Sequence, residues 1–341
     1  MRVRDLRPTR GWSAIVGALA VAMLLGSITV PTSAATATGS PGTHRKTTQS
    51  AAVAHATSPA LGSVKPTATT PGQRQVPNRV VPPPQTEGRA VAPGALQGPS
   101  RGRTSVSQAP AASRNFAGLG EGFVGPQGAF KVAGYPPDPN GDVGPNHYVQ
   151  MVNYSLAVFD KAGTVLHGPV LMKTLWSSLG GLCATDNNTD PIVLYDQLAD
   201  RWVMSQLAYQ IGGPDFECVA VSTTSDPLGT YALYAYSYDN MNDYPKMAVW
   251  PDGYYLTYVM YDSTTGAYIG GKTCALDRSK MLANLPATQQ CADYDGFSYL
   301  PSDLDGPTPP PAGSPNYILG GSWTTPDQLD VYRFHVDWAT P

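Results

Sequence analysis

Short apolar runs that alternate with turn residues dominate the chain after residue 114. Each of three segments has a valine, a turn, an aromatic residue and then an alternating apolar run. They are "DVGPNHYVQMVNY" from Asp142, "PIVLYDQLADRWVMSQLAY" from Pro191 and "KMAVWPDGYYLTYVMY" from Lys246. A weaker fourth unit, "SPNYILGGSW", surrounds Tyr317. Turn residues between β-branched and aromatic runs are typical of β-hairpins, so the pattern predicts an all-β fold.

The repeat has a period of about 50 residues. Its aligned valines, Val143, Val193 and Val249, are 50 and 56 residues apart. This is the period of a propeller blade with four short strands, so we expect a β-propeller-like repeat. Residues 115–341 hold about four units and end on a strand pattern, which predicts either a truncated copy of a longer protein or a small four-unit propeller. One helix is predicted, "LDRSKMLANL", with Asp277 as its N-cap.

The chain divides into three parts of unlike composition. Residues 1–34 carry four arginines, then an apolar run and small residues, which predicts a secretory signal peptide; an uncleaved membrane anchor is the alternative. Residues 35–114 are rich in Ala, Thr, Ser, Pro and Gly and have no aromatic residue, which predicts a disordered linker. Residues 115–341 hold every Tyr and Phe, so we expect the folded domain there.

Charge limits the possible partners. The predicted linker has nine Lys or Arg residues and one acidic residue, whereas residues 115–341 have nine basic and 23 acidic residues. A domain this acidic repels a phosphate backbone, so nucleic acid is not expected as a partner. Export predicts a secreted or cell-surface protein with no stable membrane span once the signal is cleaved.

The four cysteines, all in the predicted domain, indicate disulfides. Their number is even and the chain is predicted to be exported, which favours oxidised pairs. Pairing between neighbours, Cys183 with Cys218 and Cys274 with Cys291, is the most economical of three connectivities. The sequence has no C-x-x-C spacing, so a zinc site is not expected.

Several motifs together resemble a largely uncharacterised group of bacterial secreted or cell-surface proteins. They are "GDVGPNHYVQMVN", "DPIVLYDQLADRWVMSQ", "VSTTSDPLGTY" and "DYPKMAVWPDGYYLT". The resemblance covers residues 115–341, and it implies a β-propeller-like fold, often in longer chains. The Ala- and Pro-rich N-terminal part suits an actinobacterial-type source. No activity follows from the resemblance.

Two Asp- and Asn-rich turns are candidate calcium sites. Alternating carboxylate and amide oxygens around a turn can surround a hard cation, although neither turn has the spacing of an EF-hand. The alternative is that these side chains cap their own turns by bonding the backbone. The candidate metal ligands are Asp138, Asn140, Asp142, Asp186, Asn188 and Asp190.

An aspartate recurs just before the repeated valine of each unit. Equivalent positions of a propeller surround one axis, so Asp138 or Asp142, Asp190 and Asp243 are expected near one mouth of the channel, with Lys246 close by. The alternative is that they bond backbone N–H groups of neighbouring blades. The tyrosines of residues 231–261 either stack on sugars or pack between sheets. The candidate ligand-binding residues are Asp138, Asp142, Asp190, Asp243, Lys246 and Trp250.

The sequence favours a module that binds a glycan or a surface protein. Calcium is the one cofactor expected, as a stabilising ion. A secreted glycoside hydrolase that uses channel-mouth aspartates, and a purely structural surface module, are the alternatives. The residues Asp138, Asp190 and Glu217 resemble in order the nucleophile, transition-state stabiliser and acid of five-bladed fructan- and sucrose-cleaving hydrolases. The flanking residues and spacings depart from that family's motifs.

Overall fold

The computed structural model is an all-β fold of several antiparallel sheets with four or five strands each. Strand pairings place the sheets one after another along the chain. The structure describes the backbone of residues 2–6 and all atoms of residues 47–65, 112–132, 136–186, 190–210, 212–322, 325 and 328–340. Among these, no helix is long and apolar enough to cross a membrane.

The first two sheets each contain a four-stranded meander in which each strand pairs with the next. The strands of the first sheet are β6 (Asn140–Val143), β7 (His147–Val152), β8 (Ser155–Asp160) and β9 (Val165–Leu171). Those of the second sheet are β10 (Ile192–Asp196), β11 (Arg201–Ala208), β12 (Asp215–Ser222) and β13 (Tyr231–Tyr238). The hairpins expected in these two units are confirmed as β6–β7 and β10–β11.

The third sheet repeats the same meander, and the fourth is shorter. The third holds β14 (Met241–Trp250), β15 (Gly253–Tyr261), β16 (Tyr268–Leu276) and β17 (Thr288–Tyr294). The fourth holds β18 (Leu300–Pro301), β19 (Asn316–Gly321) and β20 (Leu329–Phe334), with β1 (Arg2–Leu6) parallel to β20. β1 belongs to the predicted signal peptide, and residues 7–34 lie outside the described residues.

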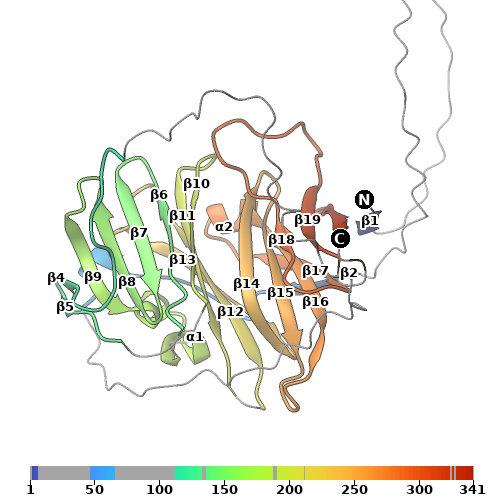
Figure 1. Ribbon diagram of the computed structural model, residues 1–341, viewed down its shortest axis with the longest axis horizontal. Helices are drawn as coiled ribbons and strands as arrows, with labels where there is room; N and C mark the ends of the chain where they lie inside the picture. Colours follow the sequence, from blue (N-terminus) through green and yellow to red (C-terminus); the bar gives the residue numbers. More distant parts are fainter. Residues whose placement is uncertain are drawn as a thin grey trace, which may run out of the picture.

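The four sheets lie side by side in sequence order, from green to red in Figure 1. The first strand of each sheet lies beside that of the next, so β6 contacts β10, β10 contacts β14, and β14 contacts β18. Apolar clusters fill the spaces between consecutive sheets, with Trp176 and Trp202 between the first two and Tyr236 and Tyr254 between the next two. These apolar clusters therefore fix the positions of the first strands of the sheets relative to one another.

An N-terminal segment lies on the outer edges of two sheets. β2 (Thr47–Ala51) pairs with β17, β3 (Ala54–Thr57) pairs with β13, and the short 3-10 helix η1 (Leu61–Ser63) follows. These residues belong to the stretch 35–114 predicted as a disordered linker, and for residues 47–65 that prediction is wrong. The hydrogen-bonding groups at the sheet edges order a segment that has little apolar surface of its own.

Small elements complete the fold. They are β4 (Val124–Gly125), β5 (Gly128–Ala129), η2 (Met172–Trp176), α1 (Gly181–Thr185) and α2 (Arg278–Leu282). The predicted helix is α2, and Asp277 caps it by accepting a hydrogen bond from Lys280 N.

Both predicted disulfides are confirmed. Cys183 on α1 is bonded to Cys218 on β12, and Cys274 on β16 is bonded to Cys291 on the neighbouring strand β17. Disulfides of this kind are typical of proteins in oxidising compartments outside the cytosol. Secretion itself stays a prediction.

Candidate functional site

The same backbone turn comes before or within the first strands of three sheets. A residue with left-handed backbone stands directly before a proline at Asp138 (φ 36°), Asp190 (φ 57°) and Tyr244 (φ 52°). In β14 the turn forms an irregularity in the pairing with β15, between Asp243 and Lys246. A left-handed residue before proline is sterically disfavoured, so the surrounding sheets must hold each turn in place. Because β6, β10 and β14 lie side by side, the three turns come together.

Three carboxylates and one lysine meet at these turns. Asp190 contacts Asp138 through a side-chain hydrogen bond, and the charges of Asp243 and Lys246 act on it as well. The pKa of Asp190 is raised to about 7, first by burial and then by the negative charges of Asp243 and Asp138, while Lys246 opposes the shift. Asn153 supports the group because its amide Nδ2 donates to Asp138 Oδ2 and, at 2.9 Å, to Pro136 O. We call Asp138, Asp190, Asp243 and Lys246 the carboxylate–lysine cluster.

Lys246 is the cation of this cluster. Burial lowers its pKa, while the charges of Asp190, Asp138 and Asp243 act in the opposite direction. Its Nζ lies 3.7 Å from the centre of the Tyr244 ring, within the range of a cation–π contact. Tyr244 is 45% exposed, so an aromatic ring stands open to solvent beside the carboxylates.

Glu217 lies behind the cluster in the interior between the second and third sheets. It has no exposed surface, and Asn242 Nδ2 donates to its Oε2 over 3.2 Å. Burial raises its pKa to about 8, with Asp190 adding to the shift and Ser205, Asn242 and Lys246 opposing it. Glu217 is therefore largely protonated at neutral pH. Glu217 resembles the acid of the fructan- and sucrose-cleaving hydrolases in sequence order only, because in this structure its side chain is buried away from solvent.

Asn140 and Asp142, in contrast, join the first sheet to the second. Asn140 Oδ1 accepts from Val193 N (2.8 Å), and Asp142 Oδ2 accepts from Tyr195 N (2.7 Å). Asp142 Oδ1 also accepts from Val143 N (2.6 Å). The alternative interpretation, in which these side chains bond the backbone of the neighbouring repeat, thus describes Asn140 and Asp142. Neither lies in the carboxylate–lysine cluster.

The described members of the two predicted calcium turns have different partners. Asp138 and Asp190 belong to the cluster, whereas Asn140 and Asp142 bond the second sheet. Asp186 follows α1, and Asn188 lies outside the described residues. In the part of the chain that the structure describes, no three acidic, His or Cys side chains are arranged to hold a metal ion. Calcium stays a prediction.

Trp250 lies away from the cluster, at the other end of β14 from Asp243. It is 8% exposed, packs between the third and fourth sheets, and donates from Nε1 to Ser314 O over 3.0 Å. The structure thus places Trp250 in the packing between these two sheets and not beside the aspartates. Alternation along a strand predicts a face of the sheet but not the end at which a ligand binds.

Most tyrosines of the second and third sheets pack in the interior, as one of the two interpretations held. Within residues 231–261 the buried ones are Tyr231, Tyr234, Tyr236, Tyr238, Tyr254, Tyr255, Tyr258 and Tyr261. The exposed Tyr244 is one of the tyrosines of residues 231–261 expected either to stack on sugars or to pack, but it is not one of the candidate ligand-binding residues. A signal for it existed, because Tyr244-Pro245 stands where the other two units have Asp-Pro.

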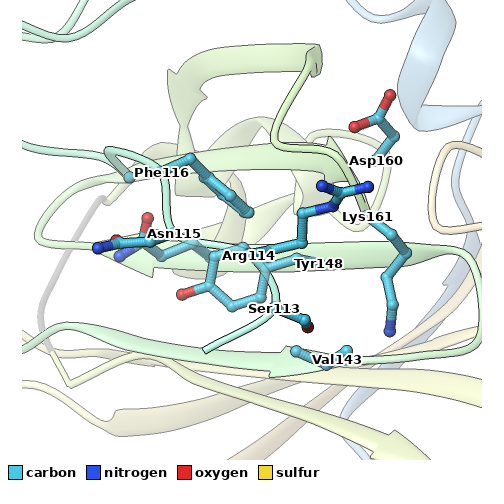
Figure 2. Close-up of a pocket in the computed structure, with 10 residues that line it drawn as sticks. Ser113, Arg114, Asn115, Phe116, Val143, Tyr148, Asp160 and Lys161 are labelled. Carbon is cyan, nitrogen blue, oxygen red and sulfur yellow. The ribbon is translucent and has the colours of Figure 1, made fainter. Parts of the chain in front are cut away.

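A separate pocket of about 500 Å³ opens at the far end of β6. It is lined by Arg114 and Phe116 from the chain before the first sheet, and by Tyr148 and Lys161 from the sheet itself (Figure 2). Lys161 Nζ donates to Gly144 O over 2.7 Å, which closes the turn between β6 and β7. None of the predicted site residues lines this pocket.

Comparison with protein-family models, with curated proteins and with solved structures gives no match to this chain.

Proposed function

We propose that this protein is an exported β-propeller-like module that binds a glycan at the carboxylate–lysine cluster. The observation that carries the proposal is the meeting of Asp138, Asp190, Asp243 and Lys246 beside the open ring of Tyr244. The proposal agrees with the sequence resemblance to secreted and cell-surface proteins of bacteria, from which no activity follows.

The arrangement of the sheets supports the propeller part of the proposal. Three consecutive four-stranded meanders each place their first strand next to that of the neighbouring sheet. Propeller blades are related in this way, with first strands around the axis and last strands outside. Side chains also join the first strands, as when Asp303 Oδ1, after β18, accepts from Val249 N of β14 over 2.7 Å. A propeller would place the cluster at one mouth of its channel.

The chemistry of the cluster suits a ligand with many hydroxyl groups. Carboxylates accept hydrogen bonds from hydroxyls, and a lysine ammonium donates to ring and hydroxyl oxygens. The exposed Tyr244 ring offers an apolar face on which the C–H face of a sugar can stack. Because carboxylates outnumber the lysine, neutral or amino sugars should bind better than acidic ones.

Binding to a polysaccharide and oligosaccharide panel, measured by calorimetry, tests this proposal. Tyr244→Ala should weaken binding about tenfold, the loss expected when roughly 1.4 kcal/mol of ring contact disappears. Tyr317→Ala is the matched control, since Tyr317 on β19 is similarly exposed (40%) but lies in the fourth sheet. Equal affinities of the two variants for a bound glycan would show that the ligand binds elsewhere.

A glycoside hydrolase is the second candidate function. It is favoured by the pKa of Asp190, about 7, because a general acid or base works best with a pKa near the working pH. Asp190 and Asp138 are in direct contact, whereas the two carboxyl groups of known glycosidases stand farther apart. This pair would therefore share one proton. Release of reducing sugar that is lost in both Asp138→Asn and Asp190→Asn would establish this function. Binding without turnover supports the module, and the absence of both leaves a structural role.

A further inference from the structure

The segment Thr47–Lys65 crosses from the edge of one sheet to the edge of the next. β2 runs antiparallel to β17 of the third sheet, and β3 runs antiparallel to β13 of the second. Between them, Ala52 N donates to Ala287 O (3.0 Å) and Val53 N donates to Ala235 O (2.8 Å). The crossing thus takes two residues, and the backbone is bonded on both sides of it.

Side chains fix the register of this segment. The His55 ring stacks on the Tyr234 ring with centroids 4.8 Å apart, and His55 Nε2 lies 3.0 Å from Asn284 Oδ1. Asn284 Nδ2 in turn donates to Thr57 Oγ1 over 2.9 Å. A shift of one residue would turn His55 away from Tyr234, so the edge selects this sequence as well as an extended backbone.

The end of the segment is anchored in the core. Ser58 N donates to Tyr231 O, and Ser58 Oγ accepts from Tyr231 N, each over 2.9 Å. Leu61 is 1% exposed within the apolar cluster of the first two sheets, and its N donates to Gly229 O over 2.9 Å. The edge therefore offers a closed apolar site in addition to strand pairing.

We propose that the outer edges of β13 and β17 form a strand-accepting site and that Thr47–Lys65 is its peptide ligand, separable from the domain. Neither disulfide includes a residue of the segment. Residues 66–111 separate it from the domain and have a contour length of at most about 165 Å, so covalent connection does not dictate where it binds. The partner that fits is an extended peptide of small residues that has an aromatic ring at the position of His55 and a leucine six residues later, at the position of Leu61. The inference does not depend on the proposed glycan site.

Cleavage of the full-length chain tests the separability of the segment. A protease recognition sequence is inserted within residues 66–111, the folded protein is cleaved, and the products are separated by native size exclusion. We expect the N-terminal piece to elute with the domain. Exchange of this piece for a fluorescent synthetic 47–65 peptide should then proceed and saturate. A piece that leaves the domain at once and is not replaced by the peptide overturns the proposal.

Two variant peptides show whether the described contacts hold the segment. A peptide with Leu61→Ala should bind about 30-fold or more weakly, the range for truncating a buried leucine. A peptide with Val53→Ala should bind like the native one, because the Val53 side chain is 61% exposed. The changes are in the peptide, so folding of the domain is unaffected. Equal binding of the two variants overturns the assignment of the site.

Discussion

Asp190 offers a direct test of the carboxylate–lysine cluster through the pH dependence of stability. Burial of its carboxyl, together with the negative charges of Asp243 and Asp138, raises its pKa from 3.8 to about 7. Asp190→Asn keeps the size of the side chain and removes its ionisation. The variant therefore isolates the free energy that is stored in the charge at this position.

The sign of the effect follows from proton binding. The folded state binds the Asp190 proton more tightly than the unfolded chain does, so this group stabilises the fold fully below about pH 4. That contribution is lost as pH rises from about 4 to about 7. A shift of about three pKa units corresponds to roughly 4 kcal/mol at most, at about 1.4 kcal/mol per unit. The asparagine variant should therefore gain up to about 4 kcal/mol on the wild type between pH 4 and pH 8.

Urea denaturation followed by tyrosine and tryptophan fluorescence measures this difference. Free energies of unfolding of the wild type and the Asp190→Asn variant are compared at intervals across that pH range. Asp239→Asn, a change at an exposed aspartate after β13, serves as the control and should run parallel to the wild type. If Asp190→Asn also runs parallel to the wild type, Asp190 is not held in a cluster of this kind.

Four further predictions concern the support of the cluster and the fold. Glu217→Gln should gain stability on the wild type as pH rises from about 4.5 to about 8 and gain no more above that in urea denaturation, because over this range the unfolded chain releases the proton that the buried carboxyl keeps. Replacing Cys274 and Cys291 by serine should lower the free energy of unfolding by about 3 kcal/mol, because the loop has 17 residues. Arg278→Ala should cost about 3 kcal/mol in the same assay, because it removes the cation paired with the fully buried Asp196. If calcium binds, EDTA should lower the melting temperature by several degrees, and an unchanged melting curve removes the calcium prediction.

The sequence was sufficient to predict the strands and much of their arrangement. Alternating apolar runs and turn residues describe β7–β8, β10–β13 and β14–β15 because each strand packs one or both faces in an apolar layer. The neighbour pairing of the cysteines was predictable for a similar reason, since close partners in sequence lie on adjacent elements. The repeat also indicated that Asp138 or Asp142, Asp190 and Asp243 lie before the matching valines, whereas in the structure it is Tyr244 that takes the position of Asp138 and Asp190.

The order of residues 47–65 was not predictable from their composition. A stretch of Ala, Thr and Ser has little apolar surface to bury, and Leu61 is its one large side chain that becomes fully buried. Its order depends on the free edges of β13 and β17, which are more than 170 residues away. Such a dependence cannot be recognised within the segment.

The sequence also left open which acidic residues of the turns form the cluster and which bond the backbone of the neighbouring sheet. Asp138 and Asp142 are four residues apart in one turn and strand, and both fitted either a ligand site or a backbone contact. The decision depends on the neighbouring sheet. Where Tyr195 presents a free backbone N–H, Asp142 accepts from it and is used for the fold.

At the other end of the same strands, the turns before proline place carboxyl groups against one another. There Asp138 meets Asp190, and the compensating charge is Lys246 rather than a backbone N–H. A scaffold that needed only to join its sheets would be better served by the contact that Asn140 makes with Val193, which brings no like charges together. Carboxylates kept in mutual repulsion at three strained turns are a cost to stability, and functional sites are where folds retain such costs. The carboxylate–lysine cluster is therefore the part of this fold that structure alone does not require.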